Sequence, residues 1–247
     1  MQTVVFLSDF GYFDPYAGIV KGAIKSNCNA DIIDLTHGIE SFSLKSAQFI
    51  LKYSFEYFPK GSVFLVVVDP QVGSLEKPIV VKRNGYIFVG RDNGILTFDG
   101  DFEVFYIDEE FKSKSSTFHA RDIFSKVVCK LLNNDIKLIK TDSYEKFDCL
   151  EVIFDNKEQK GEILWIDKFG NIITNIKSKI DNFELVVNNK IIDKKAKYYA
   201  QFKEGLFAIE GSFGFLEIAA YKNSAAELIN AKVSDEIIIR SKNESNY

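Results

Sequence analysis

Four short apolar runs, each ending in polar residues, occur in the first hundred residues: VVFLSD (4–9), DIIDLTH (31–37), VFLVVVD (63–69) and YIFVGRDNG (86–94). Continuous runs of this length, rich in β-branched residues, are typical of strands that are buried on both faces. Segments with helical periodicity follow the first, second and last of them, at 14–27, 43–58 and 121–134. This β-α-β-α-β order predicts a mainly parallel sheet covered by helices.

The three helical segments carry local signals of their own. Asp14 and Pro15 suit the N-cap and first turn of the first helix. Its apolar side is expected to comprise Tyr16, Ile19, Ala23 and Ile24. Ser43 is the expected cap of the second helix. The third has an apolar stripe formed by Phe124, Val127, Val128 and Leu131.

The pattern changes after about residue 155. NKEQKG (156–161) is expected to be a polar linker, and almost no helical period follows it. The runs 161–176, 183–192, 206–220 and 235–241 alternate short apolar segments with turns, which predicts antiparallel strands. The chain is therefore predicted to form an α/β domain over 1–155 and a small β domain over 156–247.

Composition excludes several classes of protein. Hydrophobic residues make up 46% and charged residues 27% of the chain, and the net charge of −4 argues against a nucleic-acid partner. No apolar run is long enough to span a membrane, and the N-terminus lacks the features of a signal peptide, so a cytoplasmic protein is expected. Cys28, Cys129 and Cys149 have no metal-site or CxxC spacing and are expected to be reduced.

Polar residues at the strand ends predict a ligand site, because ligands of parallel α/β sheets bind outside the carboxyl ends of the strands. An aspartate in such a place often only caps a turn, but several together favour a site. No GxGxxG motif or P-loop is present, so a ribose-bearing ligand without a phosphate chain fits best. His37 is interpreted as structural. The candidate carboxylates are Asp9, Asp34, Asp69 and Asp92.

Seven ordered segments between residue 4 and about residue 240 carry a family resemblance. They are FLSDFG with DPYAGIVKGAI, IIDLTHGI, YFPKGSVFLVVVDPQVG, FVGRDNGILT, STFHARDIF, IDKFGNIITNI and GSFGFLEIAAYKNSAAELI. In this order and at these spacings the sequence resembles the S-adenosyl-L-methionine (SAM) hydroxide adenosyltransferases. These are also called SAM hydrolases and are relatives of the fluorinase and chlorinase.

The resemblance implies a larger N-terminal α/β domain and a smaller C-terminal antiparallel β-barrel domain. It also implies a homotrimer, with SAM held between the N-terminal domain of one subunit and the C-terminal domain of a neighbour. Water or hydroxide would attack the 5′ carbon of SAM and give adenosine and L-methionine. No metal or additional cofactor is expected.

The resemblance also assigns roles to residues of the N-terminal domain. Asp9 would bind the ribose hydroxyls, Asp14 would lie close to the site, and Phe42 would form an apolar wall. Asp69 and His119 match two members of the set around the attacking water. A histidine there takes the proton, while an anchored carboxylate orients the pair.

In the C-terminal domain, the resemblance implies contacts with methionine and adenine. Asp167 and Asn171 would hold the amino and carboxylate end of methionine, with Phe169 packed nearby. Ser212 would also contact methionine. The segment 223–226, which includes Asn223 and Ala225, would contact the adenine edge.

The sequence departs from the family pattern in the loop after Asp69. Glu76 stands where the family has an arginine, and Gln71 replaces a glycine. Lys77 and Arg91 are the candidate replacement cations. The departure leaves open a second interpretation, a protein that binds SAM or adenosine but whose catalysis is reduced or lost. A dinuclear-metal phosphoesterase and a halogenase are further alternatives.

Overall fold

The computed structural model describes residues 2–71, 78–155, 158–177 and 182–241. Contacts between residues divide the chain into two compact units, with the division between Asp148 and Cys149. The roles predicted for the domains 1–155 and 156–247 stay predictions. No helix in the described ranges is long and apolar enough to cross a bilayer.

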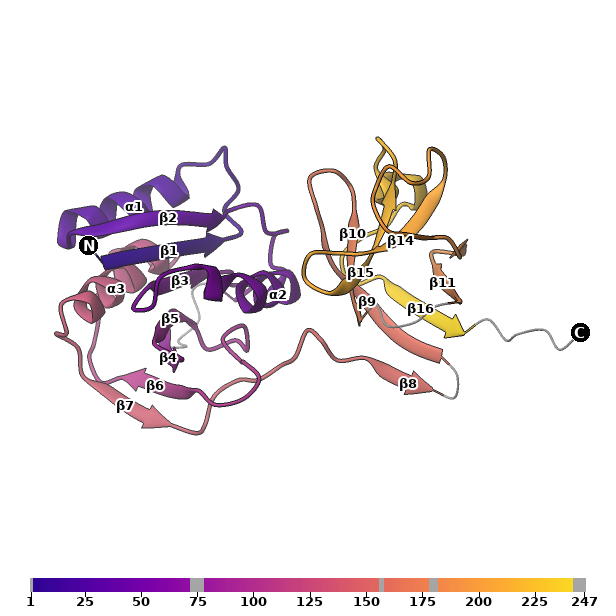
Figure 1. The fold of residues 1–247 in the computed structure, drawn as a ribbon. Helices are drawn as coiled ribbons and strands as arrows, with labels where there is room; N and C mark the ends of the chain where they lie inside the picture. Colours follow the sequence, from indigo (N-terminus) through magenta and orange to yellow (C-terminus); the bar gives the residue numbers. More distant parts are fainter. Residues whose placement is uncertain (1, 72–77, 156–157, 178–181, 242–247) are drawn as a thin grey trace, which may run out of the picture. The chain divides into compact units, whose positions relative to one another are not determined.

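The N-terminal unit is built on a seven-stranded sheet in the order β2-β1-β3-β5-β4-β6-β7 (Figure 1). Strands β2, β1, β3 and β5 are parallel, whereas β4, β6 and β7 add antiparallel pairs. The predicted α/β fold is thus confirmed, and the sheet, predicted to be mainly parallel, is mixed. The strands are β1 (Gln2–Ser8), β2 (Ala30–Thr36), β3 (Val63–Val67), β4 (Pro78–Arg83), β5 (Tyr86–Arg91), β6 (Glu103–Ile107) and β7 (Leu138–Thr141).

The prediction that the strands are buried on both faces is confirmed for most of β1 and for β3, but it is wrong for β2. Strand β2 lies at the edge of the sheet, where Ile33 is 39% exposed. Strand β4 was not predicted. It lies between β5 and β6, and the first four residues of its run PIVVKR are buried.

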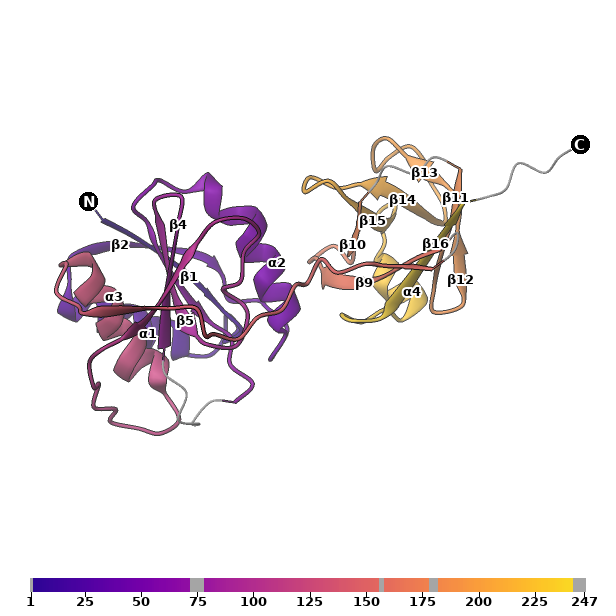
Figure 2. The ribbon, with the colours of Figure 1, turned by 90° about the horizontal axis from the view of Figure 1, so that it is seen from below.

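Helices cover both faces of this sheet (Figure 2). Val4, Phe6 and Leu65 pack against α1 and α3, while Phe64 and Phe88, on the opposite face, form an aromatic cluster beside α2. The helical segments are α1 (Tyr16–Asn27), α2 (Leu44–Ser54), the 3-10 helix η1 (Phe55–Tyr57), the π-helix η2 (Ala120–Phe124) and α3 (Ser125–Leu132).

The structure corrects the prediction for α1 and confirms those for the other two helices. Pro15, not Asp14, occupies the N-cap position, and no side chain caps the helix. The buried side is formed by Ala17, Val20 and Ile24, so the prediction for Tyr16 and Ile19 is wrong; both are more than 40% exposed. Ser43 caps α2 as predicted, and the stripe of the third segment is buried.

The prediction of reduced cysteines is wrong for Cys28 and Cys129. Cys28 and Cys129 form a disulfide that joins the C-terminal end of α1 to α3. These helices pack on the same face of the sheet, which brings the two Cα atoms to 5.4 Å although 101 residues separate them in sequence. Cys149 lies outside this disulfide and is buried.

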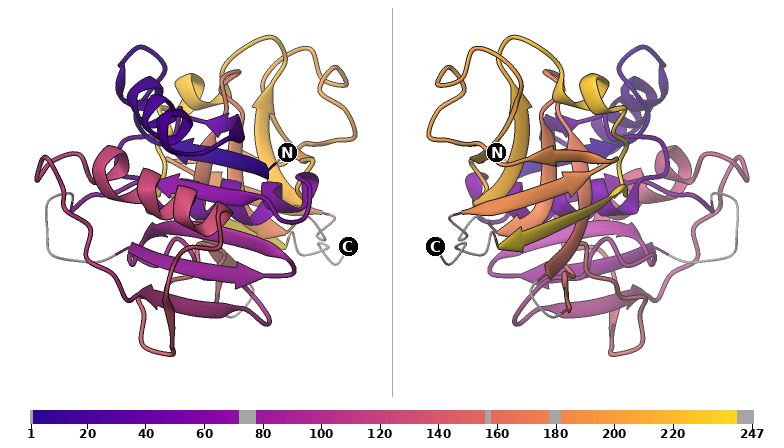
Figure 3. Two further views of the ribbon diagram at one scale, coloured as in Figure 1. Left: turned by 90° about the vertical axis from the view of Figure 1, so that its left-hand side faces the viewer. Right: turned by 90° about the vertical axis from the view of Figure 1, so that its right-hand side faces the viewer.

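The C-terminal unit is a curled, mostly antiparallel sheet (Figure 3). All its strand pairs are antiparallel except β13 with β14, as the resemblance implied for this domain. The strands are β8 (Ile153–Asp155), β9 (Glu158–Ile166), β10 (Ile172–Lys177), β11 (Phe183–Val187), β12 (Lys190–Ile192), β13 (Lys195–Ala196), β14 (Leu206–Glu210), β15 (Phe215–Ala220) and β16 (Glu236–Ser241).

Two details of this unit differ from the prediction. Residues 158–161 of the expected linker belong to β9, where they pair with β8 and β16. A short helix, α4 (Ala225–Ile229), follows β15 and is capped by the side chain of Ser224. Its five residues are too few to show a helical period in the sequence.

Candidate functional site

A cavity of about 500 Å³ lies at the carboxyl ends of β1 and β3, within the range of roughly 300–1,000 Å³ that is usual for small-molecule sites. It brings together all five site residues predicted in the N-terminal domain. The lining residues are Asp9, Phe10, Asp14, Tyr16, Ser41, Phe42, Val67, Asp69, Ser115, Thr117, Phe118, His119, Ala120, Arg121 and Phe124.

Asp9 follows directly on β1 and is held from the loop before α2. Its Oδ2 accepts a hydrogen bond from the backbone N of Phe42 at 2.9 Å. Burial raises the pKa of Asp9, and the negative charge of Asp69 adds to the shift, against the effect of the hydrogen bond from Phe42. Asp9 therefore takes up a proton more readily than an ordinary aspartate.

Phe42 has a strained backbone beside this carboxylate. Its φ of 68° lies in the left-handed region, which is costly for a bulky side chain, and its ring is 60% exposed. Backbone strain of this kind is concentrated at functional sites. The geometry presents the Phe42 ring and the Asp9 carboxylate to the same cavity.

Asp69 comes two residues after β3, and both of its carboxylate oxygens are held. The backbone N of Gln71 donates to Oδ1 at 2.9 Å, and Arg91 Nη1 lies 2.5 Å from Oδ2. The side chain is only 11% exposed. Glu76 and Lys77, named in the sequence analysis, lie outside the described residues.

His119 precedes the π-helix η2 and occupies its N-cap position without capping it. Among the described residues its imidazole has no hydrogen-bond or ion-pair partner. The ring nitrogens are thus available to a ligand or a water molecule in the cavity that His119 lines.

The segment before His119 is fixed by the buried carboxylate of Asp122, which is paired with the partly exposed Arg121. Arg121 donates to Asp122 through Nε at 2.7 Å and Nη2 at 2.9 Å. Asp122 also accepts hydrogen bonds from the backbone of Lys114 and Ser115. The bonds from Arg121 hold the pKa of Asp122 well below its usual range. An ionised Asp122 therefore anchors one wall of the cavity.

Asp34 and Asp92, two of the four candidate carboxylates, are absent from the cavity lining. Asp34 lies within β2, 2.8 Å from Lys21; burial opposes ionisation there, but the bonds from Lys21 and His37 lower its pKa. Asp92 accepts hydrogen bonds from the Tyr106 hydroxyl and from a backbone N–H. Both carboxylates hold neighbouring chain segments together.

His37 is structural, in agreement with its interpretation from the sequence. It is 2% exposed, its Nδ1 lies 2.7 Å from Ser8 Oγ, and its Nε2 lies 3.2 Å from Asp34. Burial lowers the pKa of His37. Although this row of serine, histidine and aspartate has the composition of a nucleophilic triad, Ser8 is fully buried and no substrate reaches it.

The C-terminal unit has a cavity of its own, of about 740 Å³. The three residues predicted around the amino and carboxylate end of methionine line it, together with two residues of the segment 223–226 predicted to contact adenine. The lining residues are Asp167, Phe169, Asn171, Tyr199, Ala220, Tyr221, Lys222, Asn223 and Ser224. Ser212 lies in an exposed turn outside the lining, and the Ala225 side chain is 0% exposed in the core.

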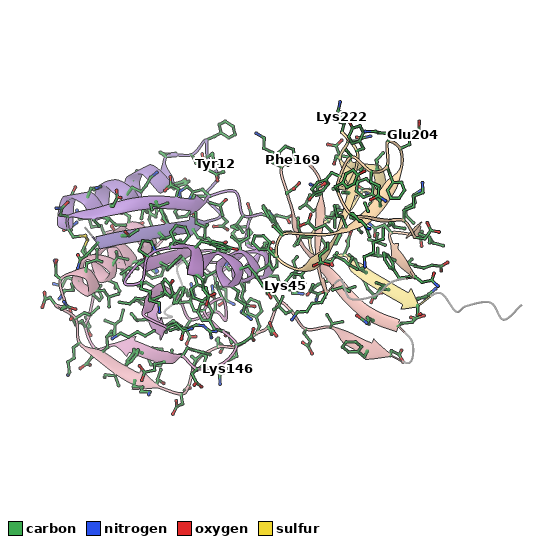
Figure 4. The ribbon with its side chains drawn as sticks, viewed as in Figure 1. Tyr12, Lys45, Lys146, Phe169, Glu204 and Lys222 are labelled. Atoms are coloured by element: carbon green, nitrogen blue, oxygen red, sulfur yellow. A yellow bond between two sulfur atoms is a disulfide. The ribbon has the colours of Figure 1, made fainter. Side chains whose placement is uncertain are left out.

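The turn between β9 and β10 shapes this second cavity. Asp167 accepts hydrogen bonds from the backbone N of Phe169 and Asn171 and from the Asn171 side chain. Gly170 has a φ of +80°, and a Cβ there would come within 2.1 Å of Ser224 Oγ. The Phe169 ring is left 76% exposed, at the loop tip labelled in Figure 4.

A hydrogen-bonded pair beside this turn, with a buried carboxylate and a partly exposed tyrosine, was not predicted from the sequence. The Tyr199 hydroxyl donates to Glu217 Oε2 at 2.8 Å, and Glu217 is 7% exposed. Burial raises the pKa of Glu217, and the nearby Asp167 adds to this shift, against the hydrogen bond from Tyr199. No local motif links these residues, which are brought together by the fold of β15.

The metal alternative gains no support from the part of the chain that the structure describes. Those residues include no group of three or more His, Cys, Asp or Glu side chains arranged to hold a metal ion. Asp69 and His119 line the cavity together, but the charged partner of Asp69 is a guanidinium.

Comparisons with known proteins cover nearly the whole chain. Residues 4–140 match the SAM hydroxide adenosyltransferase N-terminal domain and residues 161–238 its C-terminal domain. The chain is 35% identical to the (R)-S-adenosyl-L-methionine hydrolase of Methanocaldococcus jannaschii, over 97% of this chain and 96% of that protein. The hydrolase of Thermus thermophilus is 28% identical, over 94% of this chain and 97% of its own length.

Solved structures show the same fold. A conserved protein from Thermotoga maritima superposes with a TM-score of 0.83 at 33% identity, covering 97% of this chain and all of that one. A conserved protein from Thermus thermophilus gives a TM-score of 0.76 at 25% identity, with the same coverage.

Proposed function

The chain belongs to the SAM hydroxide adenosyltransferase family, and on that premise we propose that it hydrolyses SAM to adenosine and L-methionine. Water or hydroxide attacks C5′ of SAM, the C5′–S bond breaks, and the proton of the attacking water is released. The observation that carries this proposal is the cavity that combines Asp9, Asp69 and His119.

The chemistry needs little beyond alignment and removal of a proton. A sulfonium is a good leaving group, so the protein must hold water in line with the C5′–S bond. Asp69, whose two oxygens are fixed, is the group that orients the water. His119, which has no partner among the described residues, is the group that accepts the proton.

The two cavities bind different parts of SAM. Asp9 accepts hydrogen bonds from the ribose hydroxyls, with Phe42 as an apolar wall and Asp14 close by, in the N-terminal cavity. Asp167 and Asn171 bind the methionine end with Phe169 nearby, and Asn223 contacts the adenine edge, in the C-terminal cavity. Ser212 and Ala225 stay weaker candidates, because neither lines the N-terminal or the C-terminal cavity described above.

Purified protein incubated with SAM is expected to release adenosine and methionine in equal amounts, as measured by chromatography. Because the Asp69 carboxylate would repel a halide ion, added chloride or fluoride should give no 5′-halo-adenosine. SAM binding by calorimetry without release of adenosine would instead select the binding-protein alternative. Activity that a chelator abolishes would select metal chemistry.

We further propose a homotrimer in which each site combines the N-terminal cavity of one subunit with the C-terminal cavity of a neighbour. In support, each unit carries only half of the groups that SAM needs. Light scattering at assay concentration should give about three times the 28.1 kDa of one chain. A monomer that binds SAM as tightly as the assembled protein would refute the shared site.

A further inference from the structure

A buried cation stands at the end of β5. Arg91, in the segment VGRDNG, is only 4% exposed. Removing a guanidinium from water is unfavourable unless the charge is paired and hydrogen-bonded. Burial of Arg91 is therefore expected to require a charged or hydrogen-bonding partner.

The strand register provides that partner. Strands β3 and β5 are parallel, with Leu65 opposite Val89, so Arg91 comes level with the last residue of β3 and Asp69 follows just beyond it. Arg91 Nη1 lies 2.5 Å from Asp69 Oδ2 and donates to the backbone O of Gln71 at 2.7 Å. One guanidinium nitrogen thus holds both the carboxylate and the loop that follows it.

The neighbouring residues tighten this contact. A Cβ at Gly90 would meet the backbone O of Val66 at 3.0 Å, so glycine permits the close approach of β5 to β3. The Asn93 side chain donates to the backbone O of Val68 at 2.9 Å, and its backbone N donates to the O of Arg91. Segment 90–93 therefore clamps segment 66–71 at the cavity wall.

We propose that Arg91 is the positioning residue for Asp69, and that its guanidinium holds this carboxylate in the orientation that directs the attacking water. The inference rests on the proposed function. It gives Arg91, a strand residue, the place of the family arginine, since Glu76 stands at the position of that arginine. Arg91 acts through Asp69 and does not line the cavity.

Turnover measurements on Arg91→Gln, Arg91→Lys, Asp69→Asn and the double variant Asp69→Asn with Arg91→Gln test this inference. Misplacing a catalytic group by about 1 Å costs roughly 10²-fold, so Arg91→Gln should lower kcat by about 10- to 100-fold with little change in KM. Arg91→Lys should recover part of the loss. The double variant should be no slower than Asp69→Asn alone, because the two residues act as one unit.

Arg83→Gln is the matched control. Arg83 is the last residue of β4, and its guanidinium contacts the rings of Phe55 and Phe98. Its replacement therefore removes a packed arginine that lies away from Asp69. Its kcat should equal that of the unaltered protein. Urea unfolding of each variant identifies those that do not fold, and the Arg91→Lys arm then carries the test.

Two outcomes overturn the inference while leaving the proposed function intact. One is an active protein in which Arg91→Gln and Arg91→Lys keep full kcat. The other is a double variant in which the two losses multiply, since Arg91 would then act independently of Asp69. Failure of the unaltered protein to release adenosine overturns the proposed function instead, and the unfolding data still report whether the ion pair exists.

Discussion

Replacing His119 by glutamine is expected to lower kcat for adenosine release by roughly 10²- to 10⁴-fold, the usual contribution of a general base. Glutamine keeps a polar side chain of similar reach but cannot accept the proton of the attacking water. KM should change little, because SAM binding relies on other groups. Steady-state kinetics with SAM, followed by chromatography of adenosine, measure both constants.

The other histidine of the chain provides the control. His37 is buried against Ser8, so His37→Gln should lower the melting temperature and leave kcat of the folded protein near that of the unaltered enzyme. Equal loss of kcat in both histidine variants, or none in His119→Gln, would remove His119 from the reaction.

Replacing Asp9 by alanine is expected to weaken adenosine binding by roughly 10²- to 10⁴-fold. The change removes two charge-assisted hydrogen bonds to the ribose, each contributing about 1.5 to 3 kcal/mol. Calorimetric titration with adenosine gives the dissociation constant. Asp31→Ala, which removes an exposed carboxylate from the edge strand β2, is the matched control and should bind normally.

The pH dependence gives Asp9 a second signature. Its pKa is raised in the folded protein, so the folded state binds this proton more tightly than the unfolded chain does. Its contribution to the free energy of unfolding therefore increases as pH falls through the raised pKa, while adenosine binding weakens over the same interval. Asp9→Asn should remove both trends, and an affinity independent of pH in the unaltered protein would contradict the role.

Much of the N-terminal site was predictable because strand ends are visible in a sequence. Asp9 and Asp69 stop apolar runs, and the carboxyl ends of parallel strands meet at one edge. The same reasoning wrongly included Asp34 and Asp92 among the candidate site residues. A carboxylate near a strand end can equally well accept hydrogen bonds from a turn or pair with a neighbouring lysine.

What could not be predicted depends on contacts between distant segments. The bond from Arg91 to Asp69 follows from the register of β3 with β5, and the disulfide follows from the packing of α1 on α3. The buried side of α1 was mistaken because Tyr16 contributes to the cavity rather than to the core. None of these arrangements has a spacing that reveals it along the chain.

The ion pair of Asp69 and Arg91 also bears on how tightly the substrate should be held before it reacts. SAM enters with a full positive charge on sulfur, and displacement at C5′ removes that charge. A lone carboxylate near the sulfur would stabilise bound SAM more than the transition state. It would thereby raise the activation free energy of the bound substrate. With Arg91 Nη1 2.5 Å from its Oδ2, the Asp69 carboxylate could still direct a hydrogen bond, while the positive guanidinium would offset part of its attraction for the sulfonium. The ion pair would therefore let a carboxylate lie near the reacting sulfonium without stabilising bound SAM more than the transition state.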